Sequence, residues 1–360
     1  MEFLSEYGLF LLKAITIVAA IGAIVGIIVS AGSRQKTAPN GTIKVEKVND
    51  RYDEIQESLK RAIYDEERFK KEEKAKQKEK KDQKKRDKAL AKKSKGKESK
   101  DGELDESETK RVFLVDFDGD MKASAVDQLR EIVSAILFTA TPKDEVVIRL
   151  ESAGGMVHSY GLASSQLDRL KQKEIPLTVC VDKVAASGGY MMACVANKIC
   201  AAPFAIIGSI GVVAQLPNFH KLLKKNDVDF ELLTAGEYKR TLTIFGENTE
   251  KGREKFVEDL ELTHGLFKDY VKQQRPIVDI EAVATGEIWF GIKAKEQQLV
   301  DELVTSDDYV THLAQENPVF EISYTTKKSL PERLGIGVQH AIENAVTKLA
   351  NQLQASHFFR

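Results

Sequence analysis

The sequence predicts an α/β fold in which a mostly parallel sheet is covered by helices. Short apolar runs rich in β-branched residues alternate with longer segments of helical periodicity between residues 111 and 274. Two of these runs lead into turns of small residues that contain two adjacent glycines. Because strands joined by helices run parallel, their carboxyl ends share one edge of the sheet, and both turns should lie there.

At the N-terminus, residues 1–33 are predicted to form a transmembrane anchor. The stretch Ala14–Ser33 carries no charge, and the apolar Gly8–Leu12 precedes it. This length suffices to cross a hydrocarbon core, which needs about 20 residues. A cleaved signal peptide would begin with basic residues, whereas Glu2 and Glu6 are acidic. We therefore expect an uncleaved span.

Residues 34–110 are predicted to be a charged juxtamembrane spacer. Lys60–Lys100 consists mostly of Lys, Glu, Gln and Asp, a composition that buries too little apolar surface to fold by itself. Glu/Lys pairs four residues apart favour a solvated helix over Asp50–Lys93. The basic run should be attracted to anionic lipid headgroups. Nucleic-acid binding is not favoured, because no aromatic residues that could stack on bases are interleaved with the lysines.

The globular domain is predicted over residues 111–307, with strands and helices in alternation. The expected strands are Arg111–Phe117, Glu145–Leu150, Leu177–Val181, Lys198–Ala201, Ile206–Val213 and Phe230–Leu233. The expected helices are Ser124–Phe138, Tyr160–Lys173, Gly189–Ala196 and Glu250–Gln274. Residues 308–360 are expected to form a packing or assembly arm with an amphipathic helix over Val338–Leu353.

The first small-residue turn places a serine at a junction between strand and helix. Ala185-Ala186-Ser187-Gly188-Gly189 follows the strand Leu177–Val181 and precedes an apolar helical segment. The neighbours of Ser187 are too small to shield its hydroxyl, and the N–H groups at the start of a helix are free. This arrangement suits a nucleophile beside an oxyanion site. In the alternative interpretation, Ser187 only caps the helix and the glycines allow close packing.

The second turn, Glu151-Ser152-Ala153-Gly154-Gly155-Met156, follows the strand Glu145–Leu150. Its backbone should lie close to Ser187, where the N–H of Gly154 could join that of Gly188 as an oxyanion donor. The alternative is an ordinary tight turn, and the spacing alone does not decide between them.

A nucleophilic serine also needs a base, and the six histidines lie in settings that do not suggest one. The other candidate is Lys239, in the segment Ala235–Thr241. A lysine with the ordinary pKa of about 10.4 must be desolvated to be neutral at pH 7, so its site would have to be dry. The alternative is an ordinary surface lysine.

Metal and cofactor sites are not expected. Three cysteines, Cys180, Cys194 and Cys200, have spacings that fit neither a zinc site nor a disulfide framework, so buried free thiols are favoured. The sequence contains no glycine-lysine phosphate loop and no Gly-x-Gly-x-x-Gly motif after a strand.

Four motifs in order resemble the signal peptide peptidase A family. They are Gly154-Gly155 after a strand, Ala185–Tyr190 around Ser187, Ile207–Val212, and Tyr238-Lys239. The resemblance implies a ClpP/crotonase-type fold, a spiral of β-β-α units. One departure from the family pattern is Ala153, where the family usually has proline.

The same resemblance implies a Ser/Lys dyad and assigns the site residues. Ser187 would attack the peptide carbonyl and Lys239 would accept its proton. Ser209 would orient Lys239. The N–H groups of Gly154 and Gly188 would hold the oxyanion, and Gly155 and Met156 would bind the substrate.

The activity implied is that of a membrane-anchored serine endopeptidase that cleaves signal-peptide remnants or membrane-associated fragments. The family assembles into homo-oligomeric rings and places its catalytic domain in the periplasm, outside the inner membrane. The basic residues after the span point instead to the cytoplasm by the positive-inside rule, and we expect the side that the family implies. Two rival functions are an acyl-thioester enzyme of the crotonase type and a non-catalytic, membrane-tethered scaffold that binds peptides.

Overall fold

The computed structural model describes residues 41–65 and 109–326, together with Thr16, Glu67, Phe69 and Lys74 as single residues. The chain divides into a unit of residues 1–42 and 324–360 and a unit of residues 43–323, and the second contains the candidate site. Apart from Thr16, the predicted anchor lies outside the described residues, as does the predicted helix Val338–Leu353. Among the residues described, no helix is both long enough and apolar enough to span a bilayer.

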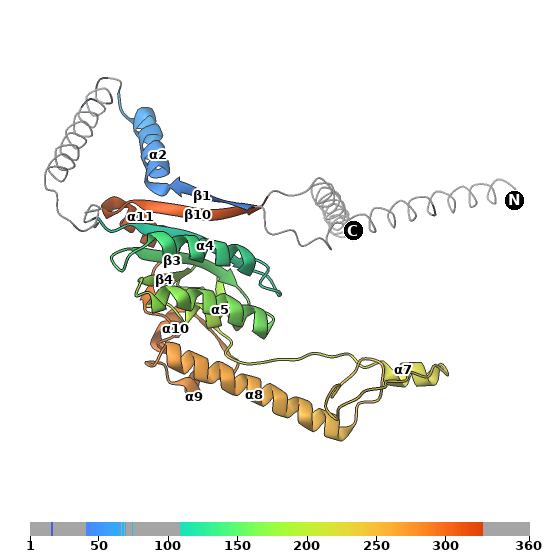
Figure 1. Cartoon of the computed structure of the whole chain (residues 1–360). Helices are drawn as coiled ribbons and strands as arrows, with labels where there is room; N and C mark the ends of the chain where they lie inside the picture. Colours follow the sequence, from blue (N-terminus) through green and yellow to red (C-terminus); the bar gives the residue numbers. More distant parts are fainter. Residues whose placement is uncertain are drawn as a thin grey trace, which may run out of the picture. The chain divides into compact units, whose positions relative to one another are not determined.

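Strands and helices alternate along the chain as predicted (Figure 1). The strands are β1 (Gly41–Lys47), β2 (Val112–Gly119), β3 (Glu145–Ser152), β4 (Leu177–Val181), β5 (Val184–Ala186), β6 (Lys198–Ala201), β7 (Ile206–Gly208), β8 (Ile288–Phe290), β9 (Glu302–Leu303) and β10 (Val319–Thr326). The helices are α2 (Val48–Ile63), α4 (Val126–Thr139), α5 (Val157–Gln172), α6 (Gly188–Ala193), α7 (His220–Lys225), α8 (Glu250–Gln274), α9 (Ile280–Val283), α10 (Gly291–Glu296) and α11 (Ser306–Glu316).

The strands form a mostly parallel sheet in the order β1-β10-β2-β3-β4-β6-β9. β2 pairs with β3 along its whole length, from Val112 opposite Glu145 to Gly119 opposite Ser152. β5 branches from the end of β3, where Ser152 pairs with Ala185, and continues through β7 to the antiparallel β8. The α/β class with a parallel sheet is therefore confirmed.

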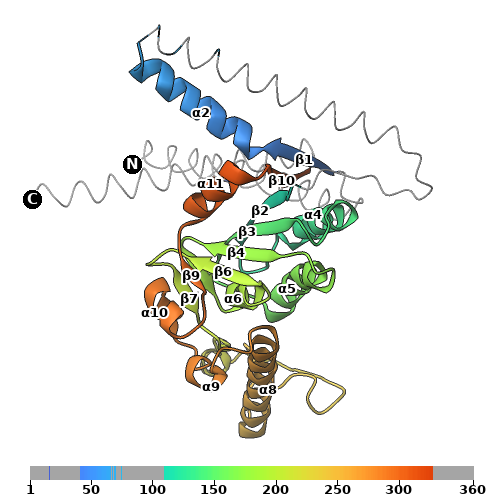
Figure 2. The ribbon, with the colours of Figure 1, turned by 90° about the vertical axis from the view of Figure 1, so that its left-hand side faces the viewer.

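Helices cover both faces of this sheet, as strands buried on both sides require. Figure 2 shows α4 and α5 on one side of the sheet and α11 on the other. The α11 side has a cluster of buried residues in which Leu114, Val147, Cys180 and Cys200 lie with Val310. All three cysteines are buried free thiols, as predicted.

Residues 41–63, which the sequence assigned to the charged spacer, are structured as β1 and α2. Val48, at the start of α2, is 2% exposed and belongs to the cluster on the α11 side. The side-chain amide of Asn49 donates to the carbonyl oxygens of Ala314 and Asn317, and its oxygen accepts the N–H of Val319. One buried valine and one fully bonded asparagine thus attach a highly charged helix to the domain.

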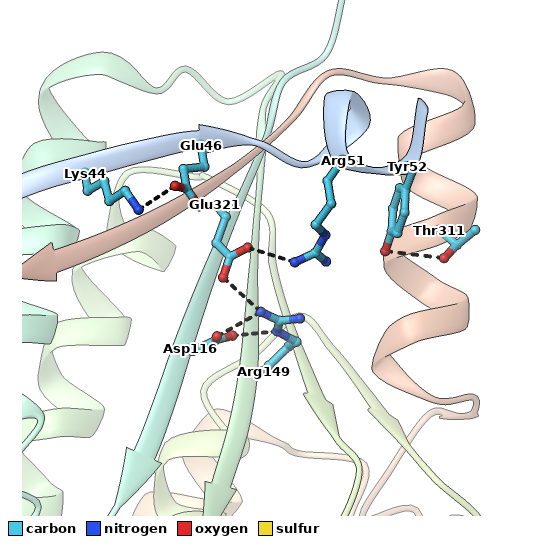
Figure 3. A network of polar contacts seen from close by, with 8 residues as sticks. All are labelled: Lys44, Glu46, Arg51, Tyr52, Asp116, Arg149, Thr311 and Glu321. Atoms are coloured by element: carbon cyan, nitrogen blue, oxygen red, sulfur yellow. Dashed lines mark hydrogen bonds and ion pairs between the residues drawn. The ribbon is translucent and has the colours of Figure 1, made fainter. Parts of the chain in front are cut away.

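A network of ion pairs adds to this attachment (Figure 3). Arg149 on β3 binds both carboxylate oxygens of Asp116, at 2.5 and 2.8 Å, and lies 3.2 Å from Glu321 on β10. The other carboxylate oxygen of Glu321 lies 4.0 Å from Arg51 on α2. Three strands and α2 therefore share one set of alternating charges.

Two predicted strands differ from the structure. The strand expected over Ile206–Val213 ends at Gly208, because Gly208 (φ 101°) and Ser209 (φ 52°) leave the extended conformation. The strand expected over Phe230–Leu233 is wrong: this segment is irregular, and Leu233 is 90% exposed. No strand in residues 41–65 or 109–326 pairs with it, so its apolar residues gain no ladder hydrogen bonds.

Candidate active site

Ser187 lies in a strained turn between β5 and α6. Its φ of 52° and ψ of −118° are unusual for a residue with a side chain, and such strain collects at functional sites. The Ser187 N–H donates to the Gly208 carbonyl (2.8 Å), and the Ser187 carbonyl accepts the N–H of Met191 (2.9 Å). The side chain makes no capping hydrogen bond. The structure therefore gives the hydroxyl no capping role and holds the serine by its backbone.

The two glycines after Ser187 are required by packing. A Cβ on Gly188 would lie 2.4 Å from Cγ of the Tyr160 ring, and one on Gly189 would lie 2.4 Å from the Ser152 carbonyl oxygen. Both distances are far below van der Waals contact. The first turn of α6 consequently lies directly against α5 and the end of β3.

The turn after β3 meets the Ser187 turn, as the strand order predicts. Gly154 has a φ of 88°, and a Cβ there would lie 2.7 Å from the Gly188 nitrogen and 2.8 Å from Ser187 Cβ. The backbone of the Gly154-Gly155 turn is thus in contact with the Ser187 turn, at the carboxyl edge of the sheet.

The hydrogen bonds of this turn modify the predicted oxyanion donors. The N–H of Gly154 donates to Ser152 Oγ at 3.1 Å, and that of Met156 donates to the Met121 carbonyl at 2.9 Å. The N–H groups of Gly155 and Gly188 have no hydrogen-bond partner within the described parts of the chain. Because the Gly154 N–H is already occupied, Gly155 rather than Gly154 offers a free donor beside Gly188.

A small cavity opens beside Ser187. Gly155 and Gly188 line it together with Ser187, and Met191 and Phe267 supply its bulkiest walls. Phe267 comes from α8, so this helix closes one side of the site. Gly155, which was predicted to bind substrate, lies in the cavity wall, whereas Met156 is 42% exposed next to it.

Ser209 lies next to the Ser187 turn. Its neighbour Gly208 is the register partner of Ala186 and accepts the Ser187 N–H. Ser209 is itself held at a φ of 52° by donation of its N–H to Glu287 O at 2.6 Å. The predicted orienting serine is therefore brought close to Ser187 by the pairing of β5 with β7.

Lys239 is not brought to Ser187 within one chain. It is exposed, and the preceding Tyr238 lies with its ring 5.9 and 5.8 Å from the ammonium groups of Lys251 and Lys255 near the start of α8. The cavity at Ser187 is lined by Thr263 and Phe267 of α8, eight to sixteen residues after these lysines, which is about 12–24 Å along the helix axis. That separation is longer than a lysine side chain. Figure 1 shows the yellow segment with α7 leaving the sheet and running to this far end of α8.

A larger cavity, of about 330 Å³, lies at the ends of β2, β3 and β4. Its lining is rich in carboxylates, but Arg149 binds Asp116 and Lys183 binds Glu151. Within residues 41–65 and 109–326, no group of His, Cys, Asp and Glu side chains is arranged to hold a metal ion. The small cavity at Ser187 is therefore the better candidate, because its lining combines a serine in a strained turn with two glycines whose N–H groups have no partner among the described residues.

Sequence comparison identifies the family of this chain. Residues 2–167 match the family described as Peptidase family S49 N-terminal, and residues 169–319 match Peptidase family S49. A protein of Haemophilus influenzae named "Probable protease SohB" is 50% identical over 352 residues, which cover 98% of this chain and 97% of that protein. The chain belongs to peptidase family S49. The family resemblance inferred from the four motifs is confirmed.

Another S49 relative, "Probable protease SohB" of Buchnera aphidicola subsp. Schlechtendalia chinensis, is 48% identical over 86% of this chain and 99% of its own length. Among solved structures, a membrane-bound stomatin-specific protease mutant in complex with a substrate peptide aligns with 63% of this chain and 97% of its own, at 12% identity and a TM-score of 0.39. This weak structural similarity adds nothing to the S49 assignment.

The sequence did not indicate the side chains that lie behind the Gly154-Gly155 turn. Ser152 stood in the glycine-rich motif without a role, and Tyr160 was only the first residue of a predicted helix. Both are buried, at 2% and 0% exposure, and their hydroxyl oxygens lie 2.5 Å apart. Burial raises the pKa of Tyr160, so its phenol remains protonated at neutral pH. A polar residue at the end of a buried strand was the one signal that could have indicated Ser152.

Proposed function

We propose that this S49 protein is a membrane-anchored serine endopeptidase in which Ser187 is the nucleophile. The observation that carries the proposal is the strained Ser187 turn, which lines a cavity together with Gly155 and Gly188, two residues whose N–H groups have no partner in the described parts of the chain. Two such donors stabilise the charge that develops on a carbonyl oxygen under attack. A cofactor is not needed for this chemistry.

The reaction proceeds in two steps. Ser187 Oγ attacks the peptide carbonyl, its proton passes to the base, and the amine leaves with that proton. Water then attacks the acyl-enzyme carbonyl, and Ser187 recovers a proton as the carboxylic acid departs. During both steps the N–H groups of Gly155 and Gly188 bind the oxyanion.

Lys239 is the base in this proposal, and a neighbouring copy supplies it. Within one chain, the segment that carries Lys239 lies toward the start of α8, away from the part of this helix that lines the Ser187 cavity. The segment that carries Lys239 exposes large apolar side chains, among them Leu233 (90%), Val213 (80%) and Phe230 (44%). An exposed apolar segment of this kind is typical of a surface that is covered on assembly. A closed ring of identical subunits would cover it at every position and bring each lysine to the next subunit's serine.

The substrates are extended peptides with small or apolar side chains next to the scissile bond. The cavity at Ser187 is small, and Met191 and Phe267 limit the volume that a side chain can fill. Signal-peptide remnants and membrane-associated fragments fit this chemistry, since both are apolar and both reach a protease held at the membrane.

The N-terminal residues 1–33 anchor the protein in the bacterial inner membrane, and the catalytic domain faces the periplasm. The uncharged stretch Ala14–Ser33 supports the anchor, and the side is the one that the resemblance to the signal peptide peptidase A family implies. Fusing a reporter that works only in the periplasm, or only in the cytoplasm, to the C-terminus tests the orientation. The branch of β5, β7 and β8 from β3 also fits a ClpP/crotonase-like spiral of β-β-α units.

A labelling experiment tests the nucleophile. Full-length protein in detergent is treated with a fluorophosphonate, and the modified residue is located by mass spectrometry while hydrolysis of a fluorogenic alanine-rich peptide is followed. We expect one label, on Ser187, and loss of both label and hydrolysis in Ser187→Ala. Ser165→Ala, at an exposed serine on α5, is the matched control and should retain both.

Full hydrolysis by Ser187→Ala would refute the proposal. Wild-type protein that binds the peptide without cleaving it would favour the scaffold function instead. Hydrolysis of acyl-thioesters but not peptides would favour the crotonase-type enzyme.

A further inference from the structure

Behind the Ser187 turn lies a chain of buried hydroxyl groups that no catalytic role explains. Ser152 Oγ and Tyr160 OH are 2.5 Å apart, and Tyr160 OH lies 2.7 Å from the carbonyl oxygen of Asp120. On the other side, Ser152 Oγ accepts the N–H of Gly154 at 3.1 Å. Four residues, from the end of β3, the turn after it, α5 and the loop after β2, are joined in one series.

The direction of the protons in this series is fixed by chemistry. A carbonyl oxygen can only accept, so Tyr160 gives its single proton to Asp120. Ser152 must then be the donor in the 2.5 Å contact, which leaves its oxygen free to accept the Gly154 N–H. The Gly119 carbonyl, 3.3 Å from Ser152 Oγ, competes only weakly for that proton. Each group in the series therefore donates to the next, from the Gly154 N–H through the Ser152 and Tyr160 hydroxyls to the Asp120 carbonyl.

The ring of Tyr160 fixes the other oxyanion donor. Tyr160 is fully buried, and the Cα of Gly188 rests so close to it that a Cβ would lie 2.4 Å from Cγ. Its hydroxyl end is equally confined, because a Cβ on Gly119 would lie 2.5 Å from it. One side chain thus touches the turn of Gly188 with its ring and holds the turn of Gly154 with its hydroxyl.

We propose that Tyr160 is a positioning residue for the oxyanion site. Tyr160 contacts neither substrate nor Ser187, but it sets the spacing between the N–H groups of Gly155 and Gly188. Its hydroxyl positions Gly155 through Ser152 and Gly154, and its ring positions Gly188 by direct contact. The proposal rests on the serine-protease function proposed above. Since catalysis by such donors depends on their placement before reaction, a shift of the turn lowers transition-state binding more than substrate binding.

Tyr160→Phe in the full-length protein tests the proposal, because it keeps the ring and removes only the oxygen. We expect kcat to fall about 10-fold, less than the 10²–10³ typical when an oxyanion donor is removed outright, and KM to stay within about twofold. The inhibition constant of a peptide aldehyde of the same sequence, whose adduct carries the oxyanion, should rise by the same factor as kcat falls.

Two further variants separate positioning from general stability. Tyr309→Phe removes a hydroxyl that donates to Glu145 at the other end of β3, and should lower the unfolding temperature without changing kcat or aldehyde affinity. Ser152→Ala should reproduce Tyr160→Phe, and the double variant should be no worse than the poorer single one, because both interrupt the same series.

Wild-type kcat and aldehyde affinity in Tyr160→Phe would overturn the proposal. The proposal would also be overturned if Tyr160→Phe weakened aldehyde and substrate binding equally. The same holds if the losses of kcat in Tyr160→Phe and Ser152→Ala multiplied in the double variant. If Tyr160→Phe does not fold, Ser152→Ala carries the same test, and failure of both to fold would assign the hydroxyls to stability alone. A wild-type protein without a reactive Ser187 would remove the protease function itself, and the positioning role with it.

Discussion

Replacing Gly189 by alanine tests how tightly α6 is held against the sheet. The added Cβ would lie 2.4 Å from the carbonyl oxygen of Ser152, and 3.1 Å from Ser152 Cβ. A side chain could rotate away, but this oxygen belongs to the backbone at the end of β3, where Ser152 pairs with both Gly119 and Ala185. The helix must therefore move rather than the strand.

The size of the effect follows from the distance. The contact distance between a carbon and a carbonyl oxygen is about 3.3 Å, so α6 must move away from β3 by about 0.9 Å. Overpacking of this kind costs about 1–3 kcal/mol, and a loss of about 2 kcal/mol would lower the unfolding temperature of a domain this size by roughly 4–8 °C. The Gly188 N–H moves with the helix. Misplacement by about 1 Å can cost about 100-fold in rate, so kcat should fall by about that factor.

Thermal unfolding and peptide hydrolysis of the full-length protein measure both effects. Gly161→Ala on α5 is the matched control, because a Cβ there meets no atom within 4 Å. In a helix that change should raise stability by about 0.5–1 kcal/mol and leave kcat unchanged. A Gly189→Ala protein with wild-type unfolding temperature and kcat would show that the packing argument is mistaken, as would a Gly161→Ala protein that loses activity equally.

Three further predictions concern other parts of the molecule. Lys239→Ala should abolish hydrolysis without lowering the unfolding temperature, and co-assembly with an equal amount of Ser187→Ala protein should restore about a quarter of wild-type activity if the lysine comes from a neighbouring copy; no recovery would argue against that arrangement. Burial alone would raise the pKa of Glu145, but bonds from Lys110, Thr178 and Tyr309 outweigh it and hold that pKa below 4.5. A carboxyl whose pKa is lower in the folded state stabilises the fold above pH 4.5, and this stabilisation is lost as the pH falls through the folded-state pKa. The stability of Glu145→Gln should therefore depend less on pH below 4.5 than that of wild type. Identical acid-unfolding curves for the two proteins would contradict this. Thr249 caps α8 by accepting the N–H of Gly252, so Thr249→Ala should cost about 1 kcal/mol in urea unfolding while Thr249→Ser costs little; equal losses would remove the cap from the explanation.

The elements that sequence reasoning placed well are those with strong local patterns. β4, β6 and α8 have the predicted bounds, because buried strands are apolar throughout and α8 ends before Pro276. Phe230–Leu233 shows that an apolar composition does not by itself make a strand. Its apolar run has the composition of a strand, but a strand also needs a partner, and the described parts of the chain supply none. Val48 shows the opposite error: it lies at helical spacing with Tyr52 and Ile55, but the charges around them assigned the whole segment to the spacer, although tertiary packing buries Val48.

Some features of the candidate site could likewise be predicted from local patterns, and others could not. Ser187 and the Gly154-Gly155 turn could be identified from the sequence, because small residues after strands are needed locally wherever two backbones approach closely. Which N–H group is free could not, since that depends on Ser152 Oγ, and the position of Ser152 Oγ depends on Tyr160 and Asp120. The place of Lys239 at the far end of α8 was equally hidden, because no local pattern reports the distance between two segments of a folded chain.

The sequence by itself determined the class of fold, the family and the alternation of the main strands and helices, and it indicated Ser187 as the candidate nucleophile, since each of these is carried by periodicity or by a short contiguous motif. Tertiary structure alone decided that Gly155 has the free donor, that Tyr160 lies behind it, and that Ser187 and Lys239 are separated within one chain. The physical reason is that hydrogen bonds and steric contacts between elements depend on ångström-scale placement, which pattern along the chain does not contain.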